Sequence, residues 1–259
     1  MDIGIIGTGN IASYLLEQVN FRHMANGKIT TIFGRNQEAG QRLSKQYDVV
    51  FHTDIQEFMK TPLDIVVEAA AVEAAALYLK EVVASKKDLV VSSIGAFKDI
   101  AFLEELKALA EAGGTHIYLP SGAIGGLDVL QSAKAVGGLK HVQITTRKSP
   151  ASLGIEADEE KLLFDGSAYE AVEKFPKNIN VALVLAIAGI GVGQTKVRIF
   201  ADPEIERNTH TIEAEGEFGR MQLQVENNPM PGNPKTSLLA ALSILSVLQN
   251  RGSALRIGN

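Results

Sequence analysis

One histidine of this 259-residue chain stands in a setting suited to acid–base chemistry. His210 begins a predicted strand directly after residues 201–209, a loop rich in Asp, Glu, Arg and Asn. Such neighbours can set the pKa of an imidazole so that it takes up or releases a proton near neutral pH. We therefore treat His210 as a candidate catalytic residue, with a purely structural histidine as the alternative. The other four histidines have no acid, serine or second histidine at a useful spacing.

A glycine-rich turn near the start of the chain has the pattern of a nucleotide-binding loop. The run Gly-Thr-Gly-Asn-Ile-Ala, residues 7–12, follows an apolar segment and opens a segment with helical apolar spacing. In such a turn Gly7 permits the sharp bend, and Gly9 lets the backbone approach a pyrophosphate at the helix N-terminus. A structural glycine turn is the alternative. The strand–turn–helix context predicts a dinucleotide site that includes Asn10 and Ile11.

The end of the second predicted strand indicates which dinucleotide is bound. An NAD site usually has Asp or Glu here to bind the adenosine ribose, but residues 32–36 contain neither. Arg35 offers a guanidinium that can pair with the 2′-phosphate of NADP, and Asn36 follows it. An exposed arginine at a helix start is the alternative. We expect NAD or NADP as the cofactor, with NADP or dual use favoured.

Small residues follow the fourth and fifth predicted strands. At the carboxyl ends of parallel strands, small side chains leave room for a nicotinamide ribose. Ala69, Ala70 and Ser93 are therefore predicted to contact the cofactor, although simple packing also explains the alanines. Glu68 precedes them as a buried-looking carboxylate that needs a partner.

A stretch of small residues, Pro-Ser-Gly-Ala-Ile-Gly-Gly-Leu-Asp at 120–128, follows the last predicted parallel strand. It places backbone N–H groups beside whatever occupies a cleft between two domains. Ser121 is a candidate substrate contact in this stretch. A glycine-rich hinge has the same composition, and the two interpretations are compatible because closing a cleft needs both.

Asn180 precedes the apolar helix predicted for residues 181–190. It is well placed to cap that helix, which is a structural role. Its functional alternative is a hydrogen bond to the carboxamide of nicotinamide.

The run Asn-Pro-Lys-Thr-Ser at 233–237 leads into the last predicted helix, residues 235–249. A helix N-terminus that carries a lysine and a threonine can hold a substrate carboxylate. Capping by the threonine alone is the alternative. The substrate candidates in this run are Asn233, Lys235 and Thr236.

Composition excludes several classes of function. The chain has no cysteine, which removes disulfides, thiolate metal sites and cysteine nucleophiles, and we predict no metal site. Its formal charge of −5 provides no basic field for a nucleic acid. The start of the chain has no cationic segment typical of a secretory signal, and no apolar run is long enough for a membrane span. We therefore expect a cytoplasmic protein that acts on a small molecule.

The order of predicted elements indicates an α/β protein with two domains. Strands alternate with helices through residues 1–122, which predicts a Rossmann-type parallel sheet. Residues 123–232 carry several strands and few helices, which predicts a second α+β domain with a mainly antiparallel sheet. We expect residues 233–259 to complete the first domain. A sheet face or edge of the second domain is a candidate contact for a homodimer.

Five strings in order resemble the L-aspartate dehydrogenase family over nearly the whole chain. They are G-x-G-N-I-A, P-S-G-A-I-G-G-L-D, F-P-K-N-I-N-V-A, A-D-P with a following N-x-H, and N-P-K-T-S. The resemblance implies a two-domain architecture like that of dihydrodipicolinate reductase. It also implies oxidation of L-aspartate at Cα by NAD or NADP, with iminoaspartate as the product. The imine can feed quinolinate and NAD biosynthesis, or hydrolyse to oxaloacetate and ammonia.

The resemblance also implies roles for single residues. Ala123 and Asn180 match cofactor contacts near the nicotinamide, and His210 matches the catalytic histidine of the family. Arg35 departs from members that have an acid at the ribose position, which argues against strict NAD specificity. Two other readings stay open: an NAD(P)-dependent enzyme for another small amino acid or a cyclic imine, and a non-catalytic NAD(P)-sensing module.

Overall fold

The computed structural model describes the whole chain except residues 136, 176–178, 256 and 258–259, and except the side chains of residues 234 and 235. The chain divides into two compact units. The first unit comprises residues 1–120 together with the C-terminal helix from residue 241, and the second comprises residues 121–240. Within the described ranges, no helix is long and apolar enough to cross a membrane.

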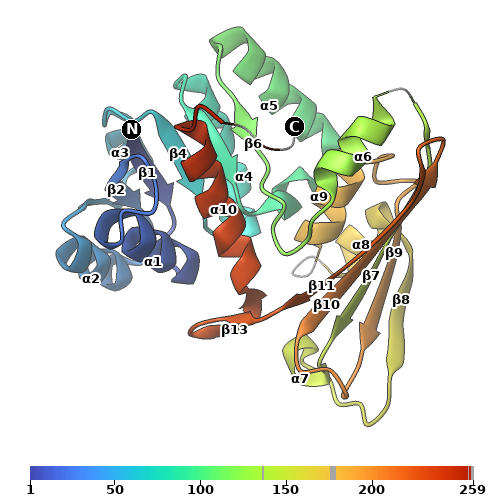
Figure 1. The fold of residues 1–259 in the computed structure, drawn as a ribbon. Coiled ribbons are helices and arrows are strands. Elements are labelled where there is room, and N and C mark those ends of the chain that lie inside the picture. Colours follow the sequence, from blue (N-terminus) through green and yellow to red (C-terminus); the bar gives the residue numbers. More distant parts are fainter. Residues whose placement is uncertain (136, 176–178, 256, 258–259) are drawn as a thin grey trace. The chain divides into compact units, whose positions relative to one another are not determined.

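The first unit is built on a six-stranded parallel sheet with the order β3-β2-β1-β4-β5-β6 (Figure 1). Its strands are β1 (Asp2–Ile6), β2 (Lys28–Phe33), β3 (Val50–His52), β4 (Ile65–Glu68), β5 (Asp88–Val91) and β6 (Ile117–Tyr118). The order reverses beside β1, as in doubly wound sheets, where ligands bind at the carboxyl ends of the strands.

Helices connect these strands. They are α1 (Asn10–Leu16) with a π-helical turn η1 (Glu17–Phe21), α2 (Gln37–Tyr47), α3 (Ile55–Met59), α4 (Val72–Ala84), the 3-10 helix η2 (Ile94–Lys98) and α5 (Ile100–Gly113). The last helix, α10 (Leu238–Arg251), returns to this unit: Ile244, Leu245 and Leu248 share one buried core with residues of β1, β4 and α1. An ion pair between Arg251 and Asp88 joins the end of α10 to β5.

The second unit is built on a five-stranded sheet with the order β11-β10-β7-β9-β8. Its strands are β7 (Leu139–Lys148), β8 (Lys161–Ser167), β9 (Lys196–Ala201), β10 (Asn208–Gly216) and β11 (Gly219–Asn227). All neighbouring pairs are antiparallel except β7 and β9. The helices are α6 (Leu127–Lys134), α7 (Pro150–Leu153), α8 (Ala168–Lys174) and α9 (Asn180–Ala188).

The two faces of the five-stranded sheet differ in polarity because side chains alternate along each strand. Ile144 of β7 and Ile212 of β10 lie side by side and are fully buried, so they mark the inner face. Thr209 and Glu213 of β10 point the other way and are partly exposed. The inner face thus carries the hydrophobic core of this unit. Polar side chains on that face are unusual, and their burial requires an explanation.

The predicted fold class is confirmed: a Rossmann-type parallel sheet domain is followed by a second domain with a mainly antiparallel sheet. The predicted start of the last helix is wrong. Residues 233–237 form β13 (Asn233–Ser237), which pairs with β12 (Pro229–Met230), and α10 begins only at Leu238. Pairing with β12 holds residues 233–237 in an extended conformation, so the helix begins three residues later than predicted.

Candidate active site

The loop between β1 and α1 has the geometry of a pyrophosphate cradle. Gly7 has φ +130°, and a Cβ at this position would overlap the carbonyl oxygen of Ala69, so only glycine fits. Gly9 has an ordinary φ of −88°, and a Cβ built on it meets no atom within 4 Å. Gly9 is also the N-cap of α1 and provides no side chain to bond the first N–H groups of the helix. An anion can therefore approach this backbone closely, and the loop fits a dinucleotide.

The helix start at this loop contains the other two predicted residues of the fingerprint. Asn10 and Ile11 are the first residues of α1, exposed and partly exposed respectively. Ala12 behind them is fully buried, which allows α1 to pack closely on the sheet. The structure therefore brings both candidates to the carboxyl end of β1.

Arg35 lies just after β2, close to the same loop. Its side chain is exposed. Gly34 explains the close approach, because a Cβ there would lie 2.6 Å from Cγ2 of Thr8. Asn36 is the N-cap of α2 and accepts a hydrogen bond from the N–H of Ala39 at 3.0 Å, so its side chain has a structural task.

A buried carboxylate ties the ends of β4 and β5 together. Glu68 is fully buried, and its carboxylate accepts hydrogen bonds from the N–H of Ala70 (2.7 Å) and the N–H of Ser93 (2.9 Å). The Ser93 hydroxyl also lies 3.0 Å from Oε1 of Glu68 and 2.9 Å from the carbonyl oxygen of Ala70. Ala69 donates its N–H to Ile6 of β1 (2.8 Å). The three predicted cofactor contacts, Ala69, Ala70 and Ser93, therefore lie together. Ser93 is the main partner that the carboxylate of Glu68 was expected to need.

Burial raises the pKa of Glu68 to about 7, against the hydrogen bonds that favour the charged form. The geometry around the Ser93 hydroxyl fits this shift. That hydroxyl has one proton but two acceptors, Glu68 and Ala70. A protonated Glu68 can donate to the hydroxyl, which then donates to Ala70, so every group is satisfied.

In the second unit, His210 lies on the inner face of β10 and is buried. Its Nδ1 is 2.9 Å from Oγ1 of Thr146, the residue directly opposite on β7. Burial, and to a smaller extent the charge of Lys148, lowers the pKa of His210 to about 3. The imidazole is therefore neutral at physiological pH and has one nitrogen able to accept a proton.

Lys148 is the last residue of β7, two positions after Thr146 and on the same face. It is mostly buried, and burial lowers the pKa of its ammonium group to about 8. Sequence reasoning missed Thr146 and Lys148. A signal was available for Thr146, which follows Val142 and Ile144 in the alternation of a strand expected at residues 141–146, but Lys148 lay beyond the expected end of that strand.

A small cavity of about 230 Å³ adjoins this end of the sheet. It is lined by Ser149, Ala151, Ser152, Glu206, Asn208, Asn227 and Pro229. Asn227 is buried and donates its side-chain N–H to the carbonyl oxygen of Ala123 at 3.0 Å. Among the described residues, none donates a hydrogen bond to the Oδ1 atom of Asn227. The predicted cofactor residue Ala123 is thus fixed to the sheet beside His210 through Asn227.

The remaining candidates lie elsewhere in this unit. Asn180 is the first residue of α9, and Ile179 is the N-cap, so the structural alternative of an Asn180 cap is wrong. Residues 176–178 of the same string lie outside the described part. Ser121 is partly exposed and its carbonyl accepts the N–H of Ile124.

The helix N-terminus predicted at Asn233, Lys235 and Thr236 is wrong, because all three belong to the strand β13, whereas their contact with substrate stays a prediction. The side chain of Asn233 donates to the hydroxyl of Thr236 (2.9 Å). The Lys235 side chain lies outside the described part of the chain.

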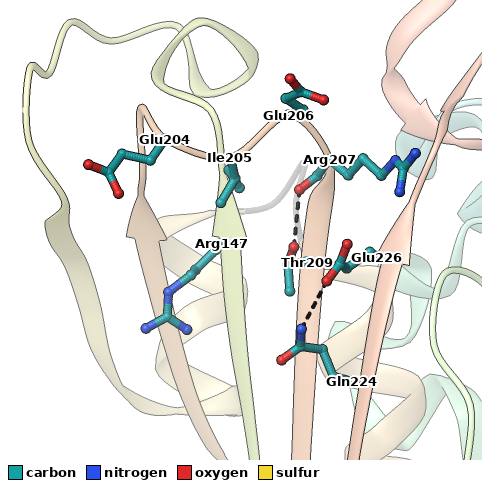
Figure 2. A pocket seen from close by; sticks show the side chains of 8 residues that line it. All are labelled: Arg147, Glu204, Ile205, Glu206, Arg207, Thr209, Gln224 and Glu226. Atoms are coloured by element: carbon teal, nitrogen blue, oxygen red, sulfur yellow. Dashed lines mark hydrogen bonds between the residues drawn. The ribbon is translucent and has the colours of Figure 1, made fainter.

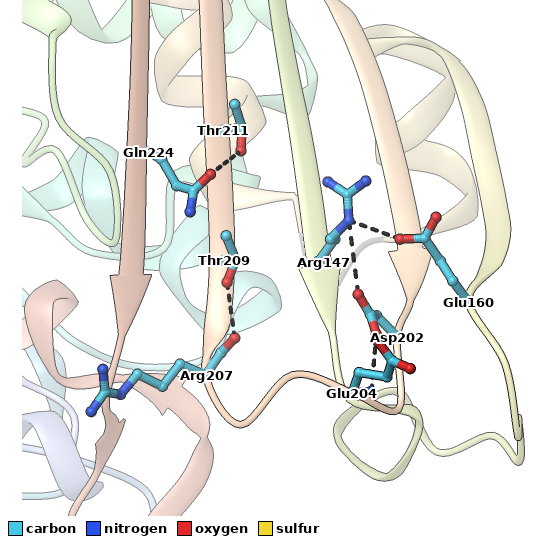
Figure 3. A network of polar contacts seen from close by, with 8 residues as sticks. All are labelled: Arg147, Glu160, Asp202, Glu204, Arg207, Thr209, Thr211 and Gln224. Carbon is cyan, nitrogen blue, oxygen red and sulfur yellow. Dashed lines mark hydrogen bonds and ion pairs between the residues drawn. The ribbon is translucent and has the colours of Figure 1, made fainter.

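The outer face of the same sheet carries a second pocket, which is lined mainly by charged and polar residues. Figure 2 shows this pocket, of about 520 Å³, with Arg147, Thr209 and Gln224 on neighbouring strands. Arg147 is engaged by carboxylates, with Nε 2.9 Å from Glu160 and 3.9 Å from Asp202 (Figure 3). These ion pairs occupy Arg147, one of the two arginines that line the outer pocket, and we assign the chemistry to the inner face, where His210 lies.

Two family models match consecutive parts of the chain. Residues 7–120 match the family described as "Homoserine dehydrogenase, NAD binding domain". Residues 128–251 match the family described as "Aspartate dehydrogenase, C-terminal".

Similar proteins cover the full length. An L-aspartate dehydrogenase of Methanospirillum hungatei is 39% identical over 99% of both chains, and one of Methanothermobacter thermautotrophicus is 39% identical over 100% of this chain and 98% of its own. The crystal structure of aspartate dehydrogenase from Thermotoga maritima superposes with a TM-score of 0.82 at 32% identity, covering 100% of this chain and 99% of the other. These relatives are oxidoreductases with a pyridine-nucleotide domain, and the chain described here belongs to the L-aspartate dehydrogenase family.

Proposed function

We propose that this protein catalyses the NAD(P)-dependent oxidative deamination of L-aspartate. The product is iminoaspartate, which either hydrolyses to oxaloacetate and ammonia or is used for quinolinate and NAD biosynthesis. One observation carries the proposal: in a chain of this family, His210 is a buried, neutral imidazole with Nδ1 held by Thr146. Such a group can remove a proton from a substrate amine.

The reaction breaks the Cα–H bond and one N–H bond of the substrate amine. A bound nicotinamide supplies the acceptor for the hydride from Cα. His210 takes the amine proton, directly or through water, because hydride leaves Cα more readily when nitrogen can form the C=N bond. If Nδ1–H donates to Oγ1 of Thr146, the Nε2 lone pair is available for this proton. In reverse, the same nitrogen returns the proton to the imine.

The first unit is proposed to hold the cofactor at the carboxyl ends of β1, β2, β4 and β5. Gly7, Gly9, Asn10 and Ile11 would hold the pyrophosphate, which the open space at Gly9 supports. Ala69, Ala70 and Ser93 would border the nicotinamide ribose. In the second unit, Ala123 and Asn180 are proposed contacts near the nicotinamide, and Ser121 is a proposed substrate contact.

Cofactor choice is proposed to depend on Arg35 and Asn36. Because Arg35 is exposed beside the glycine loop, its guanidinium is able to meet a 2′-phosphate. We propose NADP as the preferred cofactor, or use of both dinucleotides.

The test is the initial rate of nicotinamide reduction with L-aspartate, and of oxidation with oxaloacetate and ammonia. His210→Ala is expected to lower kcat by roughly 10²–10⁴-fold with cofactor binding retained. His141→Ala is the matched control, because His141 is exposed on β7 of the same sheet. Near-normal kcat in His210→Ala would remove the acid–base role. Cofactor binding without turnover of L-aspartate by the wild type would instead favour another amino acid or a sensor.

A homodimer is proposed as the working form. The proposed contact is a face or an edge of the five-stranded sheet of the second unit. Light scattering after size-exclusion chromatography measures the mass directly, and a monomer at micromolar concentration would contradict the proposal.

A further inference from the structure

Polar side chains gather in two neighbouring rows on the inner face of the five-stranded sheet. In the first row, the register places Val225, His210 and Thr146 side by side across β11, β10 and β7. In the next row, Asn227 of β11 lies opposite Asn208 of β10. The outer-face residues in Figure 2, Arg147 and Thr209 among them, alternate with these positions.

Lys148 completes the second row at the end of β7. It lies two residues after Thr146 and therefore on the same face of the sheet, and its charge contributes to the lowered pKa of His210. The neighbouring cation, Arg147, points to the outer face and pairs there with Glu160 and Asp202 (Figure 3). Arg147 and Lys148 are adjacent on β7, so their side chains lie on opposite faces of the sheet. Lys148 therefore places a positive charge on the face that carries His210.

The surroundings of this row have the features of a site for a small polar molecule. The cavity of about 230 Å³ is lined by Asn208 and Asn227, by the acidic residue Glu206, and by Ser149, which directly follows Lys148 in the chain. The buried Oδ1 of Asn227 receives no hydrogen bond from the described residues, although burying such an acceptor unsatisfied costs free energy. A ligand with a hydrogen-bond donor, such as an amino group, would satisfy it.

We propose that Lys148 is the residue that binds a carboxylate of a dicarboxylic amino acid, in the row formed with Asn208 and Asn227 beside His210. The inference rests on the proposed function and extends it to substrate recognition. An ammonium group on the face of the acid–base residue selects a substrate with negative charge close to the reacting amine. If the bound group is the side-chain carboxylate, the row distinguishes dicarboxylic from neutral amino acids.

This placement links recognition to chemistry. The positive charge of Lys148 opposes protonation of His210 in the ligand-free protein. A carboxylate bound to Lys148 offsets that charge, so His210 becomes a better base when the substrate is in place. Binding and proton removal are then coupled through one lysine.

The experiment measures the affinity of succinate for the cofactor-loaded protein by calorimetry, together with steady-state kinetics. Succinate has two carboxylates and no amine, so it reports carboxylate binding without turnover. Lys148→Met keeps the length of the side chain and removes the charge. Lys140→Met is the control, because Lys140 is an exposed lysine of the same strand. We expect Lys148→Met to weaken succinate binding and to lower kcat/KM for L-aspartate, each on the order of 100-fold. The control variant should leave both quantities unchanged.

Further measurements show which carboxylate of the substrate Lys148 binds, and they distinguish a failure of this inference from a failure of the proposed function. If Lys148 binds the side-chain carboxylate, Lys148→Met leaves kcat/KM for L-asparagine unchanged; if it binds the α-carboxylate, both substrates lose equally. Unchanged succinate affinity in Lys148→Met would overturn the inference. Cofactor affinity and thermal unfolding report whether the variant folds, and Lys148→Gln replaces it if it does not. If the wild-type protein binds succinate but does not oxidise L-aspartate, the proposed function is refuted. The role of Lys148 in carboxylate binding is then still tested by the succinate affinity of Lys148→Met.

Discussion

The hydroxyl of Thr146 lies 2.9 Å from Nδ1 of His210, across the pairing of β7 and β10. Both side chains are buried, so this contact fixes the orientation of the ring, and the hydroxyl can either accept from Nδ1–H or donate to Nδ1. If Nδ1–H donates to Oγ1, Nε2 is the base. Thr146 is then a positioning residue for the proposed proton transfer.

Replacing the hydroxyl tests this relationship. Thr146→Val keeps the branched shape but removes the hydroxyl, so Nδ1 of His210 loses its partner and the base is less well oriented. We expect kcat to fall roughly tenfold or more with little change in cofactor affinity. Thr146→Ser restores the oxygen and should recover most of the activity. Equal kcat in the valine and serine variants would show that the hydroxyl only fills space.

The two glycines of the nucleotide loop should respond differently to the same substitution. In Gly7→Ala the new Cβ would overlap the carbonyl of Ala69, and φ +130° is unfavourable for alanine. We expect this variant to lose at least about 1–3 kcal/mol of folding free energy in denaturant titration. In Gly9→Ala the Cβ meets open space, so stability should be near wild type while fluorescence titration shows at least about tenfold weaker cofactor binding. Unimpaired binding in Gly9→Ala would place the pyrophosphate elsewhere.

Arg35 is predicted to set the ratio of kcat/KM for NADP and NAD. Arg35→Asp removes the partner of the 2′-phosphate and supplies an acid for the ribose hydroxyl, so the NADP/NAD ratio should fall by at least about tenfold. Arg42→Asp, on the exposed surface of α2, makes the same charge change away from the strand end. The same shift in both variants would indicate a general field effect rather than a contact.

Local sequence patterns were sufficient for the first unit. Apolar runs separated by helical spacing define a parallel sheet, and its topology dictates that β1, β2, β4 and β5 bring their carboxyl ends to one edge. The role of Glu68 was anticipated as a need for a partner, but Ser93 as that partner depends on the neighbouring strand. Pairing between strands is a tertiary property, so a single sequence cannot name it.

The second unit was harder to predict because its site is made by strand register. Thr146, Asn208 and Asn227 are distant in sequence and meet only through the pairing of β7, β10 and β11. The short helices α6 and α7 were also missed, since four to eight residues give too little periodicity. At the end of the chain, β-pairing of residues 229–237 overrode the helical interpretation.

Glu68 is predicted to make stability depend on pH. Its folded pKa is about 7 against an ordinary value of 4.5, so the native state holds a proton between these values that the unfolded chain has lost. Stability is unaffected by this group below about pH 4.5, falls as pH rises to about 7, and then levels off roughly 3 kcal/mol lower.

Denaturant titrations of wild type and Glu68→Gln over this range isolate the effect. Glutamine does not titrate, and its amide nitrogen cannot accept the N–H of Ala70, so the variant loses a constant amount of stability at every pH. The difference between the two proteins should therefore shrink as pH rises from about 4.5 to about 7. A difference that is flat with pH would mean that Glu68 is ionised throughout.

Lys148 is predicted to make dicarboxylate binding depend on pH on the alkaline side. With a pKa of about 8 in the ligand-free protein, its ammonium group is charged below that pH and neutral above it. Succinate affinity should be constant up to about pH 8 and then fall by up to about tenfold per pH unit, since only the charged form binds. The nearby His210 is already neutral there, and the carboxylate of Asp202 is directed to Arg147, so neither explains such a loss. Lys148→Arg keeps its charge at all these pH values and should bind succinate without the alkaline fall, although arginine's different shape lowers its affinity. An alkaline loss that persists in Lys148→Arg would assign the titration to another group and would separate it from carboxylate recognition.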